Sequence, residues 1–212
     1  MSGSCYESTA RAAAMLKIYG SLPSRTFRCL WMLEEAGAPY QWIRVPFKEL
    51  RSPAYLALNP NGKMPVIQDG PLVLWESIAI NLYIAQKYGG PLWPADSEDC
   101  GLIYQWSLWA VNEIEPAVVA ALAAKDRELD NKDRLREPLR VLDTVLSKRA
   151  HLLGEELTAA DINVAGILSS IFSTGLSFRE QGHVVRWLGK CLERPYPKQF
   201  FGMEYARKVC RT

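Results

Sequence analysis

The feature that most restricts the possible folds of this chain is a break at residues 89–94. The sequence there is Gly-Gly-Pro-Leu-Trp-Pro, so two glycines and two prolines fall within six residues. Such a segment supports neither a helix nor a strand and is typical of a linker. Strand and helix patterns alternate before it, whereas only helical periodicity follows it. We therefore predict two domains, 15–88 and 96–212, joined by a linker at 89–95.

The first domain opens with alternating strands and helices. Residues 16–19 alternate in hydrophobicity and predict a strand, and 25–36 then carry a helical pattern. A second strand is predicted over 41–45, and Ser52-Pro53 marks the start of a short helix as a capping residue and a first-turn proline. The order so far is strand, helix, strand, helix.

A hairpin completes this domain. Residues 65–68 and 72–75 flank Asp69-Gly70, which is a strong two-residue hairpin signal, and Ser77 is placed to cap a following helix. A parallel strand pair joined by a helix, followed by an antiparallel hairpin and a helix, gives a small mixed sheet. The prediction is an α/β domain with four strands in the order βαβαββα and helices on both faces of the sheet.

The second domain is predicted to be all-α. Helical patterns cover 96–125, 132–150, 158–172 and 178–192. Thr158-Ala-Ala-Asp161 has the spacing of a capping box, and the helix after it is apolar nearly all round. We expect that helix to be the buried centre of the domain.

Composition excludes several classes of function. The net charge is only +2, and the basic residues are scattered among acidic ones, which argues against a nucleic-acid partner. Five cysteines without a Cys-x-x-Cys pair, together with only two histidines, indicate a reducing compartment and no metal site. Apolar runs are shorter than the ~20 residues that span a bilayer. Residues 1–14 are expected to be a disordered leader or extension.

The segment around Met64-Pro65 is the most informative for function. A proline that begins a strand removes one ladder donor. If the Met64-Pro65 bond is cis, the backbone of Met64 faces outward, where an extended peptide can pair with it. The alternative is an ordinary loop with two prolines.

Glu76-Ser77 forms a second candidate binding element. The N–H groups at a helix start and the Ser77 hydroxyl suit a carboxylate, and Glu76 suits an ammonium group, so together they fit an amino-acid head group. The alternative is a plain capping serine after a strand.

These motifs in this order resemble the cytosolic glutathione transferase family, of the serine type or of an atypical bacterial-like class. The resemblance rests on a strand–loop–Ser–helix start, on Asn-Pro-x-Gly-Lys-Met-Pro-Val and on Glu-Ser-Ile-Ala-Ile, and it covers essentially everything after residue 14. It implies a thioredoxin-like first domain, a helical domain that supplies the pocket for a hydrophobic co-substrate, a cytoplasmic location and a homodimer. It further implies a glutathione site made of Arg51, Lys63, Met64, Pro65, Glu76 and Ser77.

In this family the reacting atom is the glutathione sulfur, which is activated as a thiolate. A free thiol with a pKa near ~8.5 is only a few per cent thiolate at neutral pH. Ser24 matches the position from which serine-type members donate a hydroxyl, although it is equally suited to cap the helix that follows. Arg25 offers a permanent positive charge that shares or replaces that role. Both are candidate catalytic residues.

The co-substrate pocket is the least defined part of the resemblance. Leu22, Tyr104, Trp109 and Asn112 are candidate lining residues, whereas Trp106 is expected to be core. The expected reaction is conjugation of glutathione to small hydrophobic electrophiles. Two alternatives stay open: peroxide reduction, disulfide reduction or isomerisation at the same site, and a non-catalytic interaction module.

Overall fold

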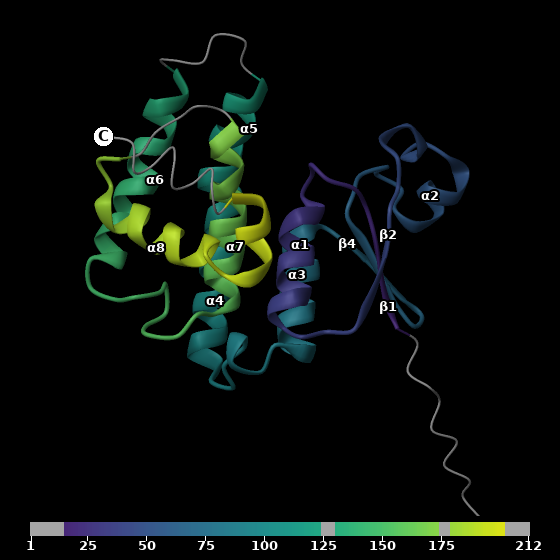
Figure 1. The fold of residues 1–212 in the computed structure, drawn as a ribbon, viewed down its shortest axis with the longest axis horizontal. Helices are drawn as coiled ribbons and strands as arrows, with labels where there is room; N and C mark the ends of the chain where they lie inside the picture. The colour runs from purple at the N-terminus through teal and green to yellow at the C-terminus, as the bar shows by residue number, and fades with distance from the viewer. Residues whose placement is uncertain (1–14, 124–129, 174–178, 202–212) are drawn as a thin grey trace, which may run out of the picture.

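The computed structural model describes residues 15–123, 130–173 and 179–201, so the predicted leader at 1–14 lies outside the described residues (Figure 1). The first half contains four strands and three α-helices. They are β1 (Leu16–Tyr19), α1 (Thr26–Glu35), β2 (Tyr40–Ile43), α2 (Pro53–Leu58), β3 (Val66–Asp69), β4 (Leu72–Trp75) and α3 (Ser77–Tyr88). This order is the predicted βαβαββα.

The sheet has the strand order β2-β1-β3-β4. β1 and β2 are parallel, with Ile18 opposite Trp42, and β3 is antiparallel to both β1 and β4. The mixed sheet predicted from the helix-linked pair and the hairpin is therefore confirmed. A hydrogen bond from the Gly20 N–H to the Ile43 carbonyl follows the paired residues of β1 and β2. β2 ends at Ile43, two residues before the predicted end of the second strand.

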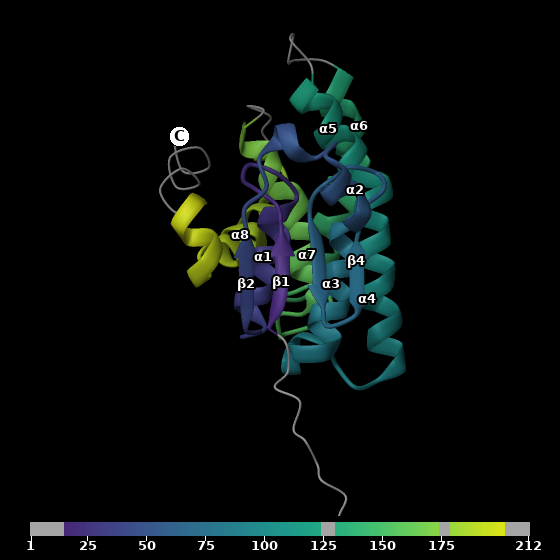
Figure 2. The same ribbon diagram turned by 90° about the vertical axis from the view of Figure 1, so that its right-hand side faces the viewer.

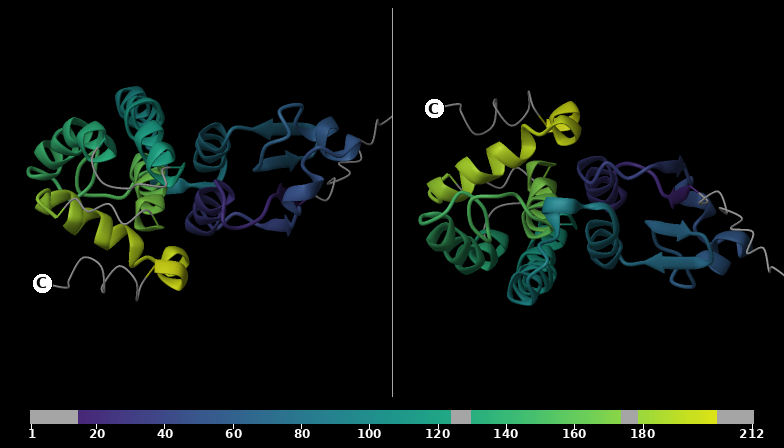
Figure 3. Two further views of the ribbon diagram at one scale, coloured as in Figure 1. Left: turned by 90° about the horizontal axis from the view of Figure 1, so that it is seen from above. Right: turned by 90° about the horizontal axis from the view of Figure 1, so that it is seen from below.

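Helices cover both faces of the sheet, as predicted. α1 and α3 pack together between the sheet and the helical half, while α2 lies on the opposite face (Figures 1 and 3). The inner layer buries large side chains completely, among them Ile18, Leu30, Trp31 and Ile80. On the α2 side a smaller cluster forms around Val45, Tyr55, Met64 and Val66.

All the secondary-structure elements described in the second half are helices. Its helices are α4 (Ser97–Trp109), α5 (Glu115–Ala123), α6 (Asp130–Leu146), α7 (Ala159–Leu168) and α8 (Gly182–Leu192), with a 3₁₀ segment at Ser169–Ser173. All of α7 is buried, and it packs on both α1 and α3, so it joins the two halves (Figure 2). The expectation of a central buried helix is confirmed, and so is the capping box, in which Asp161 accepts the Thr158 N–H at 3.0 Å.

The single helix predicted over 96–125 is wrong. Between α4 and α5 the backbone widens into a π turn at Ala110–Ile114, closed by a bond from Glu115 N–H to the Ala110 carbonyl. Pro116 has no N–H to donate, so the regular α-helical ladder is interrupted at this point. The extra residue sets the position of Glu115, which becomes important below. Residues 124 and 125 lie outside the described residues.

Candidate site at the ends of the first-domain strands

The Asn59–Met64 loop is held from within and leaves the backbone of Met64 unpaired. The carbonyl of Lys63 accepts hydrogen bonds from Asn59 Nδ2 at 2.7 Å and from Tyr55 Oη at 3.0 Å. The Met64–Pro65 bond is cis, and among the described residues no hydrogen bond uses the main-chain N–H or carbonyl of Met64. Its sulfur accepts the N–H of Ser21 at 3.1 Å, which ties this loop to the one after β1.

Two candidate cations lie beside the same loop. Gly62 has a φ of +59°, and a Cβ built there would lie 2.8 Å from the Leu50 carbonyl and 3.1 Å from Arg51 Nη1. Arg51 therefore packs on the turn that carries Lys63, and both side chains belong to exposed residues. Arg51 thus lies beside the turn that carries Lys63, although the two residues are twelve positions apart in the sequence.

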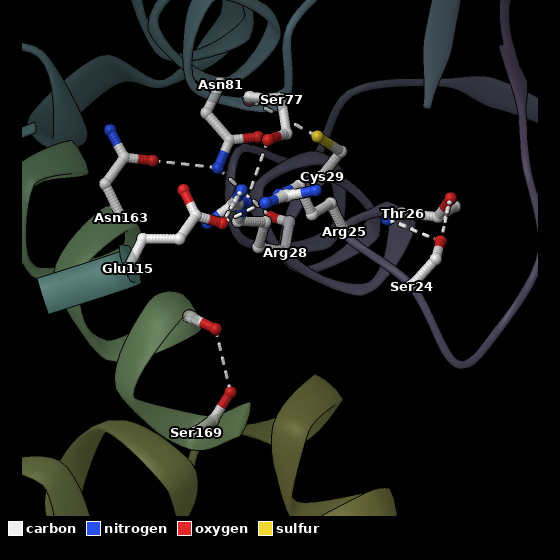
Figure 4. Close-up of polar contacts among 11 residues, drawn as sticks. Ser24, Arg25, Thr26, Arg28, Cys29, Ser77, Asn81, Glu115, Asn163 and Ser169 are labelled. Atoms are coloured by element: carbon white, nitrogen blue, oxygen red, sulfur yellow. Dashed lines mark hydrogen bonds and ion pairs between the residues drawn. The ribbon is translucent and has the colours of Figure 1, made fainter. Parts of the chain in front are cut away.

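The Glu76–Ser77 element differs from the prediction in one respect. Ser77 is the first residue of α3 rather than its capping residue, and Glu76 precedes the helix with a φ of 72° and makes no capping bond. Glu76 is the only described non-glycine residue with a positive φ. The Ser77 hydroxyl instead accepts a hydrogen bond from Arg28 Nε at 2.9 Å (Figure 4).

Ser24 lies one residue before the N-cap of α1, which is Arg25, yet its hydroxyl makes a bond of the capping kind to the first N–H of the helix, that of Thr26. Its Oγ accepts the N–H of Thr26 at 3.0 Å and also lies 2.6 Å from the carbonyl of Ser21 and 2.8 Å from Thr26 Oγ1 (Figure 4). Gly20 makes this packing possible, because a Cβ there would lie 2.2 Å from Thr26 Oγ1. The hydroxyl proton of Ser24 therefore has partners inside the loop.

Arg25 is not a lone charge beside the loop. Its Nε binds Glu115 Oε1 at 2.7 Å, and Arg28 Nη2 binds the same oxygen at 2.9 Å. Glu115 comes from the helical half, at the end of the π turn, so one carboxylate joins α1 to the second half of the chain. Arg25 keeps its permanent positive charge, but it shares that charge with Glu115, and its role beside the sulfur stays a prediction.

Comparison with known proteins explains this set of loops. The family model for the glutathione S-transferase N-terminal domain matches residues 14–86, and the model for the C-terminal domain matches residues 110–195. The chain belongs to the glutathione S-transferase family. A probable glutathione S-transferase of Oryza sativa subsp. japonica is 32% identical over 201 residues, covering 86% of this chain and 94% of the relative.

Solved structures agree with these matches. Poplar glutathione transferase F1 superposes with a TM-score of 0.79 at 26% identity, covering 91% of this transferase and 99% of that chain. A theta class glutathione S-transferase of Xanthomonas axonopodis pv. citri, with glutathione bound, gives a TM-score of 0.75 at 30% identity, covering 93% and 98%. Both the sequence and the fold therefore place this chain in the family over nearly its full length.

Burial shapes the charges at the centre of this transferase. Arg28 is only 3% exposed, and burial lowers the pKa of its guanidinium while the charge of Glu115 opposes that shift. Burial alone would raise the pKa of Glu115, but the charges of Arg28 and Arg25 and their hydrogen bonds outweigh it and hold the pKa below its ordinary value. The pair is thus held in its ionised form.

Sequence reasoning missed both Arg28 and Glu115. Arg28 follows Arg25 by three residues, so the two share a helix face, and that spacing was the available signal. Nothing in the sequence placed Glu115 opposite them, because its position depends on the π turn and on how the two halves pack.

The candidate pocket residues of this transferase make different contacts. Tyr104 packs its ring on that of Trp93 at 5.6 Å and is 44% exposed, and its place in the pocket stays a prediction. Trp109 packs edge-on against Trp106 at 5.2 Å, and Trp106 is core as expected. Leu22 is half-buried against the main core, and Asn112 is exposed.

Two absences are found within the described ranges of this transferase. Residues 15–123, 130–173 and 179–201 contain no group of three or more His, Cys, Asp or Glu side chains arranged to hold a metal ion. No helix in these ranges combines the length and apolar character needed to cross a membrane.

Proposed function

We propose that this transferase binds glutathione along its first domain and activates the thiol as a thiolate for attack on small hydrophobic electrophiles. The observation that carries the proposal is the unpaired backbone of Met64, which lies on a loop tied to the Ser24 loop through the Ser21–Met64 hydrogen bond. An extended peptide that pairs with this backbone gains main-chain hydrogen bonds like those of an added strand.

The proposed glutathione site has one group for each part of the tripeptide. Glu76 and Ser77 take the γ-glutamyl ammonium and carboxylate, and Met64, followed by Pro65, pairs with the cysteinyl backbone. Lys63 and Arg51 take the glycyl carboxylate, which the packing of Arg51 against the turn that carries Lys63 supports. Relatives support the ligand: the Xanthomonas structure has glutathione bound, and another similar structure, glutathione S-transferase-I, has lactoylglutathione bound.

Activation of the thiol is assigned to the Ser24 hydroxyl. Its oxygen keeps the capping bond from the Thr26 N–H, and its proton turns from the Ser21 carbonyl to the sulfur when glutathione binds. A hydroxyl has one proton and two lone pairs, so capping and thiolate stabilisation are compatible. One charge-assisted hydrogen bond contributes about 1.5–3 kcal/mol, which corresponds to a thiol pKa lowered by about 1–2 units.

The test has two stages. The first is retention on immobilised glutathione, followed by turnover with halogenated nitroarenes, isothiocyanates and organic hydroperoxides. We expect retention and conjugation of at least one electrophile class. A protein that binds glutathione but is inactive with every electrophile would refute the conjugation reaction, and a protein that flows through would refute the glutathione site itself.

The second stage measures the thiolate absorbance of bound glutathione against pH in Ser24→Ala and Arg25→Ala. We expect Ser24→Ala to raise the thiol pKa by about 1–2 units. Arg25→Ala should change it less, because Glu115 already pairs with that guanidinium. The reverse order would move the catalytic assignment from Ser24 to Arg25.

We further propose a cytoplasmic homodimer, with domains at 15–88 and 96–212 joined by the linker at 89–95. Exposed apolar side chains support the dimer, since they lie on the edge strand β4 and on the helices α4 and α5. They are Leu72, Val73, Trp75, Leu108, Val119 and Leu122. Patches of this kind mark interaction surfaces. A monomer in sedimentation at micromolar concentration would refute the dimer.

A further inference from the structure

Ser21 uses all three of its polar groups to hold the loop between β1 and α1. Its N–H donates to the sulfur of Met64 at 3.1 Å, and its hydroxyl donates to the carbonyl of Val45 at 2.8 Å. Its carbonyl accepts the hydroxyl proton of Ser24 at 2.6 Å. These partners lie before β3, after β2 and before α1, so Ser21 joins three parts of the first domain.

The side chain of Met64 offers its sulfur from a fixed position. Met64 is only 9% exposed and packs in one cluster with Val45, Tyr55 and Val66. A thioether is a weak acceptor, but a tightly packed side chain has little freedom to move away from its donor. An aliphatic side chain could fill the same space, yet it would offer no acceptor to the N–H of Ser21.

The two donor bonds of Ser21 also fix the direction of its carbonyl. Each residue has only two soft backbone dihedrals, so holding the N–H and the side chain leaves the carbonyl little freedom. The preceding residue is held as well, because the Gly20 N–H bonds to the Ile43 carbonyl at 3.1 Å and the Gly20 carbonyl accepts Trp42 Nε1 at 2.8 Å. The carbonyl that holds the Ser24 proton therefore has a defined position.

We propose that Ser21 is a positioning residue for the Ser24 hydroxyl, and that the Met64 thioether anchors it. This inference rests on the proposed function, in which the backbone of Met64 pairs with the cysteinyl part of glutathione. Met64 then acts twice: its backbone places the thiol, and its sulfur holds the loop from which Ser24 reaches that thiol. The distance between the thiol and its donor is thus set by one residue, and an error of ~1 Å in such a distance is costly.

The central experiment is Met64→Leu, which keeps an apolar side chain of similar volume and removes the acceptor. The thiolate absorbance of bound glutathione is measured against pH. We expect the thiol pKa to rise by about half a unit, which is about threefold less thiolate at a pH below that pKa. An unchanged thiol pKa in the folded variant would overturn the proposal.

An S-substituted ligand separates positioning from binding. S-methylglutathione has no ionisable thiol, so its affinity depends on the backbone pairing and not on Ser24. We expect Met64→Leu to bind it within about twofold of the parent in calorimetry, because the backbone of Met64 is retained. An affinity that falls by as much as the thiolate fraction would assign the Met64 side chain to ligand binding and overturn the proposal.

A double-mutant cycle tests whether the sulfur acts through Ser24. In the Ser24→Ala background, Met64→Leu should have almost no further effect on the thiol pKa, because the hydroxyl that it positions is gone. Ser21→Ala removes the bond to Val45 and should raise the thiol pKa as Met64→Leu does, whereas Ser21→Thr keeps the hydroxyl and should stay near the parent. Additive effects in the cycle, or no effect of Ser21→Ala, would overturn the proposal.

Met32→Leu is the matched control. Met32 is a fully buried methionine of α1, and within residues 15–123, 130–173 and 179–201 its sulfur accepts no hydrogen bond. The control should leave the thiol pKa unchanged. Equal rises in the Met32 and Met64 variants would indicate general loosening of the domain and overturn the proposal. A parent protein that does not bind glutathione, or that leaves the thiol pKa at its ordinary value, would instead refute the proposed function.

Discussion

The capping carboxylate of α7 allows a quantitative prediction, because both of its oxygens are in use. Asp161 Oδ1 accepts hydrogen bonds from Leu152 N–H at 2.9 Å and from Trp187 Nε1 at 2.8 Å. Oδ2 accepts from the N–H of Thr158 at 3.0 Å and lies 3.2 Å from its hydroxyl. Asp161 and its neighbours are buried, so water cannot replace these bonds.

In Asp161→Asn the amide keeps one acceptor oxygen and presents an NH₂ group on the other side. If the oxygen stays toward Leu152 and Trp187, the buried N–H of Thr158 loses its acceptor, which costs about 1–3 kcal/mol. The two remaining bonds lose their charge assistance, about 1 kcal/mol each. The expected destabilisation is about 3–5 kcal/mol, or about 6–20 °C in Tm for a chain of this length.

Asp143→Asn is a matched control. Asp143 caps the start of α8, but its two hydrogen bonds, from His183 N–H at 2.8 Å and Val184 N–H at 3.2 Å, both fall on Oδ1. An amide oxygen preserves both, so the bonds lose only their charge assistance, about 1–2 kcal/mol in total. Thermal unfolding of both variants by circular dichroism checks the difference. Equal shifts in Tm would refute the reasoning that the number of occupied oxygens sets the cost.

Three further predictions concern the charges, the thiols and the glycyl end of the site. For Glu115→Gln, the folded-state pKa of Glu115 is lowered, so the stability that its charge contributes is present above the ordinary value of 4.5 and is lost as the pH falls through the lowered folded-state pKa; chemical unfolding of parent and variant should differ at pH 7, and the difference should shrink as the pH is lowered below 4.5. Burial raises the pKa of Cys29 to about 12, so alkylation at pH 8 followed by mass spectrometry should find Cys29 modified far more slowly than the half-buried Cys100, and equal rates would contradict the buried position. Gly62→Ala should raise the KM for glutathione several-fold, because the added Cβ meets the Leu50 carbonyl. Gly70→Ala is its control: Gly70 has nearly the same φ, +58°, but no atom lies within 4 Å of the added Cβ, so this change should lower the free energy of unfolding only by the backbone cost of about 1 kcal/mol.

The parts of the fold that the sequence predicted correctly depend on local signals. Asp69-Gly70 lies between two apolar strands, a sequence that specifies a two-residue hairpin. β3 and β4 pair around it as expected. The capping box at Thr158 is likewise complete within four residues. The linker at 89–95 stays a prediction; within these residues the structure has a short 3₁₀ turn at Gly90–Leu92, and α4 begins at Ser97.

The errors arise where a residue's role depends on a partner distant in sequence. Ser77 has the sequence of a capping residue, but its hydroxyl bonds to Arg28, 49 positions away, so α3 begins at Ser77 itself. Arg25 pairs with Glu115, 90 positions away, across a π turn that periodicity does not reveal. Propensity and periodicity carry no information about such contacts, because the contacts form only when separate elements pack.

The packing of α1 connects the candidate glutathione site to the helical half. One face of α1 carries the Ser24 loop and Arg28, and the same helix packs on α7. Without the second half, Arg28 would lose Glu115 and the close packing at Gly166, and a buried arginine would be left without a carboxylate. Such a group stays charged and draws in water, which would release Ser77 from its fixed hydrogen bond. The first domain therefore contributes most of the candidate glutathione contacts, but the helical half fixes the orientation of the serine at their centre.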